Sequence, residues 1–216
     1  MSEAVTAMAL RVNGGAELDL LLQEVDSDDV TTADAEANLG PVILGNIAAN
    51  SPRLAATAAA DAALVNKLCD YATDSNGNKI LATEAAFALA CIARHSRDEL
   101  PRENLISAIE GRLRVLLSSS DSDPNGLLLT RALVFALGEL SGGTEDGFGQ
   151  IEESGALEQL VRLLESPIEL VRRDVAGALE LVTRACDDES RRNICGDNID
   201  RLLLVTSLDP HDDSLD

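Results

Sequence analysis

The chain has 216 residues, and its 38 acidic against 17 basic side chains give a formal net charge of −21. Because nucleic-acid phosphates attract a basic surface, this excess of acid disfavours binding to nucleic acid through charge alone. Aromatic residues make up only 2% of a chain that is 45% hydrophobic, which favours closely packed helices, since strands draw on aromatic and β-branched side chains.

Two families of apolar segments alternate along the chain at a nearly constant interval. Segments of the first family start at residues 18, 64, 109, 157 and 199, at intervals of 46, 45, 48 and 42 residues. Segments of the second family are richer in small residues and start at residues 42, 87, 135 and 177, at intervals of 45, 48 and 42. A helical repeat of this length is typical of a solenoid, in which each unit buries its apolar faces against its neighbours.

The fourth copy of the repeat is the clearest. The segment 155-GALEQLVRLLES-166 places apolar side chains at the i, i+3, i+4 and i+7 positions, which predicts an amphipathic helix. The residues 166-SPIE-169 indicate the start of the next helix, with Ser166 as its cap, Pro167 in its first position and Glu169 completing a capping box. The unit is therefore a helix, a linker and a second long helix.

The same copy resembles a known family. The run 151-IEESGALEQLVRLLES-166, followed by 170-LVRRDVAGALELVT-183, resembles an armadillo repeat, with its small first helix, its Gly-Ala turn and its "LV-x-LL" second helix. The resemblance implies an all-α fold, a right-handed α-solenoid of about four armadillo-like repeats plus a C-terminal half repeat. HEAT repeats, which are also helical and of similar length, are the structural alternative.

The repeats divide the chain into three parts. Residues 1–15 form an N-terminal extension, residues 16–208 the armadillo-like repeat domain, and residues 209–216 an acidic tail. In the first copy, Gly40 and Pro41 fall inside the expected third helix, where a proline should kink or split it. The approximate repeat boundaries are 16–50, 51–95, 100–142, 150–185 and, for the half repeat, 187–208.

The stretch 119-SSDSDPNG-126 matches the opening half of an EF-hand calcium loop. An EF-hand needs a bidentate Glu at its twelfth position, and the twelfth residue counted from Asp121 is Ala132. We therefore predict no metal site and assign the stretch to an insertion in a linker between helices.

Equivalent linkers lie along one edge of a solenoid, so their carboxylates are expected to line up. One hypothesis is an acidic ridge along that edge, and the alternative is ordinary solvated turn chemistry. The residues of the ridge are Asp26, Asp28, Asp29, Asp74, Asp121 and Asp123.

Armadillo proteins hold extended peptides in a concave groove lined by their third helices, and the resemblance implies the same use here. Importin-alpha recognises nuclear localisation signals with a Trp and an Asn four residues apart on that helix. Among the corresponding positions of this chain only Asn46 matches, which argues against a receptor for such signals. The other positions are Val42, Phe87, Cys91, Phe135, Glu139, Gly177 and Leu181.

Four arginines lie within about one turn of these positions, and they permit opposite hypotheses. Arginine suits bidentate pairing with carboxylates, so the groove is either a basic surface for acidic peptides or part of an acidic surface for basic ones. Phe87 and Phe135 are assigned to the core in preference to a peptide platform. The candidate groove residues are Asn46, Phe87, Arg94, Arg131, Phe135, Glu139, Arg173 and Arg184.

A third interpretation is that the arginines are neutralised within the fold. Acidic residues on adjacent faces would then pair with them, and each pair would contribute little to stability if it is exposed. The acidic residues expected to do so are Glu84, Glu139, Asp174 and Glu180.

Catalysis and cofactor binding find little support. The two histidines are His95 and His211, and no Ser, His and Asp arrangement can be proposed from them. Cys91 and His95 are four residues apart, yet a zinc site needs about four ligands and no second pair stands at a suitable spacing. We predict that the chain is not an enzyme and uses no cofactor and no metal.

Cysteine spacing and hydropathy bear on location. The sequence has no CxxC pair, no visible secretory signal and no run of about 18 apolar residues that could span a bilayer. We expect no membrane insertion, and a cytoplasmic protein, with the nucleus as an alternative location. The cysteines expected to be reduced and buried are Cys69, Cys91, Cys186 and Cys195.

Together these features predict a non-enzymatic protein-protein interaction module. It would bind an extended peptide or a folded partner in the groove of the third helices. The alternatives are a regulator or exchange factor for a small GTPase or an Hsp70 chaperone, roles in which armadillo-like folds also serve, and an importin-alpha-like transport adaptor. The half repeat 187–208 lacks a third helix, so self-association through its apolar face is a further expectation.

Overall fold

A computed structural model describes residues 39–118 and 123–186. Within these ranges the chain is helical and contains no strand. The α-helices there are α4 (Leu39–Asn50), α5 (Pro52–Ala60), α6 (Ala62–Thr73), α7 (Lys79–Ser96), α8 (Arg102–Ser118), α9 (Pro124–Ser141), α10 (Glu145–Glu153), α11 (Ala156–Leu163) and α12 (Glu169–Val182). Two short 3₁₀ helices are η1 (Arg97–Glu99) and η2 (Thr183–Ala185).

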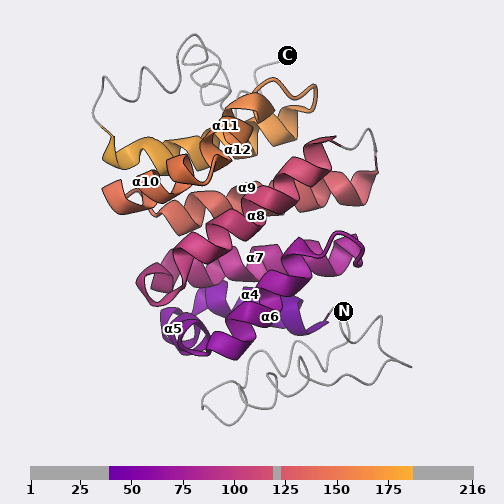
Figure 1. Cartoon of the computed structure of the whole chain (residues 1–216). Coiled ribbons are helices and arrows are strands. Elements are labelled where there is room, and N and C mark those ends of the chain that lie inside the picture. The colour runs from indigo at the N-terminus through magenta and orange to yellow at the C-terminus, as the bar shows by residue number, and fades with distance from the viewer. Residues whose placement is uncertain (1–38, 119–122, 187–216) are drawn as a thin grey trace, which may run out of the picture.

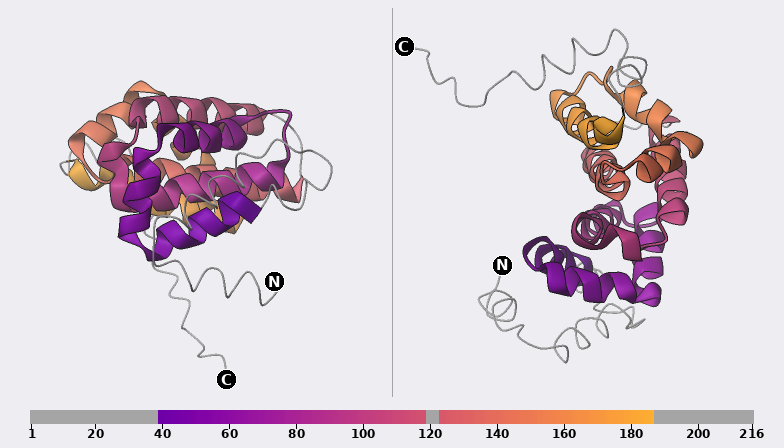
Figure 2. Two further views of the ribbon diagram at one scale, coloured as in Figure 1. Left: turned by 90° about the horizontal axis from the view of Figure 1, so that it is seen from below. Right: turned by 90° about the vertical axis from the view of Figure 1, so that its left-hand side faces the viewer.

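The helices form two layers that follow an arc (Figures 1 and 2). Helices α4, α7, α9 and α12 pack one against the next and make the inner layer, while α6, α8 and α11 make the outer layer. Each outer helix also packs on the inner helix of its own repeat. This arrangement confirms the predicted all-α solenoid.

The second, third and fourth repeats contain two or three α-helices each. The second repeat contains α5, α6 and α7, and the fourth contains α10, α11 and α12. The fourth repeat begins with α10 at Glu145, before the expected residue 150. In the third repeat the short first helix is reduced to η1, ahead of the long α8. The first repeat is described only from Leu39, and the N-terminal extension, the half repeat and the acidic tail lie outside the described residues.

The expected start of the last inner helix needs correction. Helix α12 begins at Glu169, and its cap position is Ile168, which forms no side-chain cap. Ser166 Oγ instead accepts a hydrogen bond from the Ile168 N–H at 3.2 Å, and the Ser166 carbonyl accepts one from Arg172 Nη1 at 2.7 Å. Ser166 therefore shapes the turn before the helix, and the predicted capping box is absent.

The proline of the first repeat does not interrupt the described helix. Pro41 lies in α4, whose described part continues without a break to Asn50. By contrast, the Gly-Ala turn expected in the fourth repeat is confirmed, since Gly155 has a φ of 81° and joins α10 to α11.

Small residues let the inner helices approach one another closely. A Cβ atom added to Gly138 of α9 would lie 3.1 Å from the Cα atom of Ala178 in α12. A Cβ atom added to Gly45 of α4 would lie 3.1 Å from Phe87 Cδ1 and 3.4 Å from the Cα atom of Ala88 in α7. Interiors are close-packed, so at these two contacts the inner helices have room for small side chains only.

Polar contacts join neighbouring repeats in a constant direction. In five contacts between described residues, a cationic side chain of one repeat donates to an acceptor of the next, 43 to 45 residues further along the chain. The contacts are Lys79 to Asp123, Arg94 to Glu139, Arg97 to the Gly142 carbonyl, Arg102 to Asp146 and Arg131 to Asp174.

Two glycines of α10 give a matched test of this packing. A Cβ atom at Gly147 would lie 2.0 Å from the carbonyl oxygen of Ser141, whereas a Cβ atom at Gly149 would meet nothing within 4 Å. We expect Gly147→Ala to lower the free energy of unfolding by about 2 kcal/mol, because α10 must move away from α9. Gly149→Ala should raise it by about 0.5 to 1 kcal/mol through helix propensity.

Urea unfolding followed by circular dichroism at 222 nm measures both effects. Equal changes in the two variants would contradict the close approach of α10 to the end of α9.

Candidate functional site

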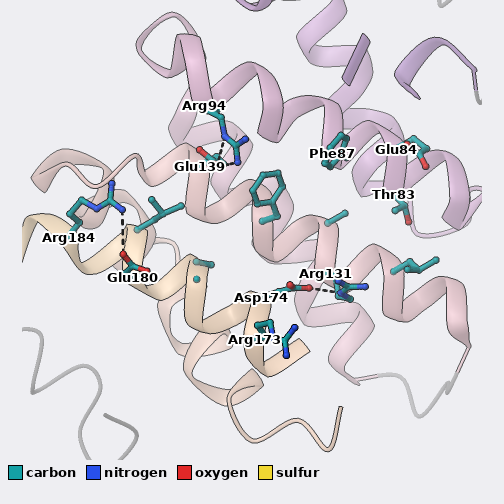
Figure 3. Close-up of a pocket in the computed structure, with 16 residues that line it drawn as sticks. Thr83, Glu84, Phe87, Arg94, Arg131, Glu139, Arg173, Asp174, Glu180 and Arg184 are labelled. Carbon is teal, nitrogen blue, oxygen red and sulfur yellow. Dashed lines mark hydrogen bonds and ion pairs between the residues drawn. The ribbon is translucent and has the colours of Figure 1, made fainter. Parts of the chain in front are cut away.

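A groove of about 860 Å³ crosses the inner helices α7, α9 and α12 (Figure 3). It is open to solvent and is lined by side chains from all three helices, so no single repeat forms it. Its lining residues are Thr83, Glu84, Phe87, Arg94, Leu128, Arg131, Ala132, Phe135, Glu139, Arg173, Asp174, Gly177, Ala178, Glu180, Leu181 and Arg184.

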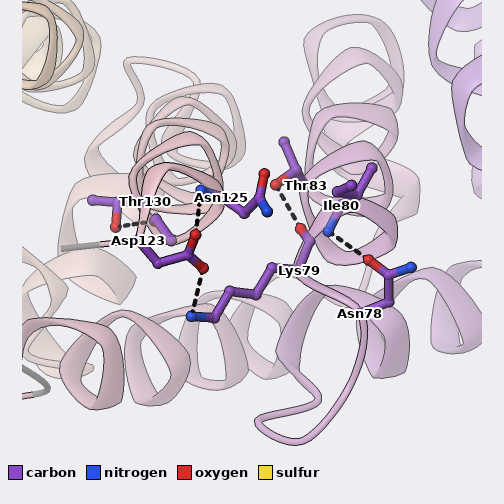
Figure 4. A network of polar contacts seen from close by, with 8 residues as sticks. Asn78, Lys79, Ile80, Thr83, Asp123, Asn125 and Thr130 are labelled. Atoms are coloured by element: carbon purple, nitrogen blue, oxygen red, sulfur yellow. Dashed lines mark hydrogen bonds and ion pairs between the residues drawn. The ribbon is translucent and has the colours of Figure 1, made fainter. Parts of the chain in front are cut away.

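The start of each helix fixes how its side chains reach the groove. Asn78 caps α7 by accepting the Ile80 N–H at 2.9 Å, and Asp123 caps α9 by accepting the Asn125 N–H at 3.1 Å. The other oxygen of Asp123 accepts a hydrogen bond from Lys79 Nζ at 2.9 Å (Figure 4). The Lys79 ammonium holds the pKa of Asp123 below its usual range. One carboxylate thus starts α9 and ties it to the first residue of α7.

Two phenylalanines form an apolar platform in the groove. The rings of Phe87 and Phe135 stack with centroids 5.9 Å apart and an interplanar angle of 25°, although they belong to different repeats. Phe87 is 37% exposed, and Phe135 is half-buried against the core. The guanidinium of Arg94 lies 5.2 Å from the centre of the Phe135 ring, a distance at which a cation is attracted to the ring face.

Two ion pairs of the groove join neighbouring helices. Arg94 donates from Nε and Nη2 to one oxygen of Glu139, at 3.0 and 2.7 Å, and the Glu139 side chain is only 11% exposed. This hydrogen bonding raises the pKa of Arg94 above its already high ordinary value. Arg131 donates from Nε to one oxygen of Asp174. Because hydrogen bonds between a guanidinium and a carboxylate are strong, these arginines are held in place by the fold.

The two remaining arginines, one on α12 and one on η2, each form a longer ion pair with a glutamate of α12. Arg173 lies 3.3 Å from Glu169, and Arg184 lies 3.6 Å from Glu180, each partner being one turn earlier. All four side chains are more than half exposed, and exposed pairs at this spacing contribute roughly 0.3 to 0.5 kcal/mol.

Neutralisation of the arginines within the fold is thus correct for three of the four expected acidic residues. Glu139, Asp174 and Glu180 each pair with an arginine, but the partner of Arg173 is Glu169. Glu84, the fourth, has no hydrogen bond or ion pair with any described residue. Burial raises the pKa of its carboxyl above the usual value, since a half-buried charge has lost part of its hydration.

Most of the predicted groove residues do come together. Seven of the eight line the groove, and the exception is Asn46, which is exposed on α4 and donates from Nδ2 to the Val42 carbonyl at 2.9 Å. The assignment of the phenylalanines to the core is wrong for Phe87, because its exposed ring faces the groove.

The acidic ridge is described only in part. Asp74 ends α6 and accepts a hydrogen bond from the Asn76 N–H at 2.9 Å, which is ordinary turn chemistry. Asp123 is paired with Lys79, so a cation lies within the line of carboxylates. The other four residues assigned to the ridge lie outside the described residues.

Several lining residues were missed by sequence reasoning, although a signal was present for Thr83. Thr83 precedes the predicted Arg131 by 48 residues, and Arg131 precedes the predicted Arg173 by 42, the same intervals that separate Phe87, Phe135 and Gly177. Equivalent positions of successive repeats face the same way. A groove arginine in one repeat therefore indicates that the equivalent residues of the other repeats also face the groove. By the same intervals, Ile80 and Leu170 are the equivalents of Leu128 in the neighbouring repeats, and all three side chains are exposed.

The part of the chain that the structure describes offers neither a membrane span nor a metal site. None of its helices combines the length and the apolar content needed to cross a bilayer. No group of His, Cys, Asp and Glu side chains is placed to hold a metal ion in residues 39–118 and 123–186. Of the cysteines, Cys91 is buried beneath the groove, Cys69 and Cys186 are half-buried, and Cys195 lies outside the described residues.

Comparison with known proteins gives the class of fold. No protein-family model matches the chain, and no curated protein matches it. An engineered protein known from its crystal structure is 26% identical with a TM-score of 0.67, over 96% of this chain and 83% of that one. A second engineered protein is 25% identical with a TM-score of 0.62, over 88% of this chain and 70% of that one.

A designed armadillo repeat protein, solved in complex with the peptide (KR)4, is also similar. It is 17% identical with a TM-score of 0.66, over 98% of this chain and 84% of that one. The fold of this chain is therefore armadillo-like, as the residues of the fourth repeat predicted.

The buried thiol beneath the groove predicts a loss of stability at high pH. Burial raises the pKa of Cys91 to about 11, from 9.0; Arg94 lowers it and Glu139 raises it by smaller amounts. The thiol of the unfolded chain loses its proton near pH 9, before that of the folded chain, so the free energy of unfolding falls as pH rises from 9 to 11.

Urea unfolding between pH 8 and 11 tests this expectation. The Cys91→Ala variant should lose stability less steeply over that range, because its remaining titrating groups are unchanged. Parallel curves for the two proteins would show that Cys91 ionises normally in the fold.

Proposed function

We propose that the chain is a non-enzymatic protein-interaction module that binds an extended segment of a partner protein in the groove across α7, α9 and α12. The observation that carries the proposal is the stacked pair of Phe87 and Phe135, exposed between hydrogen-bonded ion pairs. A soluble fold gains nothing from leaving a large ring such as Phe87 in water, and exposed aromatic side chains are enriched at binding surfaces.

The dimensions of the groove suit a short extended segment. Packed helices lie 8 to 10 Å apart, so the path from α7 over α9 to α12 is roughly 16 to 20 Å long. An extended chain advances about 3.3 Å per residue and covers that path with five or six residues. An apolar side chain in the middle of such a segment would rest on the ring of Phe135.

Two further observations support the proposal. The similar designed armadillo protein is solved with the peptide (KR)4, so a chain of this fold accommodates a peptide. Gly177 provides the second: a Cβ atom there would meet nothing within 4 Å, so the floor of the groove on α12 is open.

The alternative functions have less support. Recognition of nuclear localisation signals would use Asn46, which lies outside the groove and bonds to its own helix. No contact among the described residues favours a GTPase or an Hsp70 chaperone as the partner.

Selection from a random dodecapeptide phage library tests the function. Peptides enriched on the full chain should bind about tenfold more weakly to Phe135→Ala, because loss of a buried aromatic contact commonly costs 1 kcal/mol or more. Gly177→Leu should weaken them similarly by filling the groove, since its Cβ atom would meet nothing within 4 Å.

The matched control is Val115→Ala, which removes an exposed apolar side chain from the outer helix α8. It should bind every selected peptide like the parent. Recovery of peptides that bind all four proteins equally would contradict a binding site in the groove.

A further inference from the structure

One carboxylate of the groove, Glu84, has no cationic partner among residues 39–118 and 123–186. The four groove arginines each have an acidic partner within the fold, whereas Glu84 pairs with none of the described residues. Glu84 lies on α7 one turn before Phe87, and Figure 3 shows both residues on the same helix at one end of the groove. A half-buried carboxylate beside an exposed ring is a site for a lysine or arginine side chain, which gains an ion pair and a cation–π contact together.

The opposite end of the groove offers a positive charge. Arg173 lies on α12, and its pair with Glu169 is long and exposed, with side chains 51% and 59% accessible. Replacing that partner by a ligand carboxylate costs little, since exposed pairs of this kind contribute a few tenths of a kcal/mol. Arg94 differs, because its hydrogen-bonded Glu139 is nearly buried and does not exchange easily.

The two charges lie along one line across the stack. Arg173 is equivalent by register to Arg131 and Thr83, and Thr83 is the neighbour of Glu84 in α7. A segment that crosses the inner helices at this level therefore meets Glu84 first, then Arg131 with its partner Asp174, and Arg173 last. Two helix spacings separate the ends, which is the length of five or six extended residues.

We propose that the groove selects a segment carrying a basic residue at the α7 end and an acidic residue at the α12 end, five or six residues apart, with an apolar residue between them. This inference rests on the proposed function and names the chemistry of the partner. The sequence left two opposite hypotheses, a basic groove for acidic peptides and an acidic surface for basic ones. Under this inference each applies to one end, because the groove is acidic at the α7 end and basic at the α12 end.

Uniformly charged ligands fit the groove less well. A wholly basic segment places a cation beside Arg131 and Arg173, whose carboxylate partners are already engaged. A wholly acidic segment places a carboxylate beside Glu84 and approaches a chain with a net charge of −21.

Synthetic peptides with one central leucine and two variable positions six residues apart test the inference. The variable positions carry Lys and Glu in both backbone orders, two Lys, two Glu, or two Gln. One of the two mixed peptides should bind most tightly, with each charged contact contributing about fivefold in Kd over Gln. Isothermal titration calorimetry at 50 mM salt measures the affinities.

Substitutions in the groove assign the two ends. Glu84→Gln should remove the gain from the peptide lysine only, and Arg173→Gln the gain from the peptide glutamate only. The double variant Glu84→Arg with Arg173→Glu should prefer the mixed peptide of the opposite backbone order. The control Glu158→Gln, at an exposed position of the outer helix α11, should behave like the parent.

The outcomes distinguish a failure of the charge order from a failure of the proposed peptide-binding function. Equal binding of all peptides, tightest binding of a uniformly charged peptide, or an unchanged preference in the double variant overturns the charge order. If none of these peptides binds while the phage library yields groove-dependent ligands, the charge order alone is wrong. If neither experiment yields a groove-dependent ligand, the groove function is wrong as well.

Discussion

The close contact between inner helices is the constraint on which the rest of this structure depends. Gly138 against Ala178 and Gly45 against Ala88 leave no space for larger side chains, so the helices stack at a short and regular distance. Regular stacking brings equivalent positions into line, which is how residues from three repeats form one groove. It also explains the composition, because a core built this way uses alanine and glycine where other folds use aromatic residues.

The charge of the molecule has a different origin from the charge of the groove. The described residues include 13 of the 17 basic but only 19 of the 38 acidic side chains, a net charge of −6. Most of the total of −21 therefore belongs to sequence outside these ranges. Within the groove, each arginine has an acidic partner and Glu84 has none among the described residues, so the local arrangement of Glu84 and Arg173 carries more information about a ligand than the total does.

Helical periodicity was enough to predict the solenoid, because it follows from which face of a helix a residue occupies. The candidate groove residues came from the resemblance to armadillo repeats, and seven of the eight line one groove. Periodicity was not enough to predict partners. Whether Glu139 or Asp174 pairs with an arginine of the preceding repeat depends on the relative placement of neighbouring helices, which single-helix patterns do not contain. The start of α12 was misjudged for a similar reason: Arg172 binds the Ser166 carbonyl and draws the preceding residues into a turn.

The constant direction of the contacts between repeats has a consequence for how such a chain can evolve. Each described repeat that donates a cation, as Arg94 and Arg131 do, requires the matching acceptor in its successor. A repeat copied to another position by recombination would then face a neighbour without Glu139 or Asp174, and its arginine would lose its partner. The repeats are thus alike in backbone but not interchangeable. The donor of one repeat and the acceptor of the next together fix the order of the repeats along the chain.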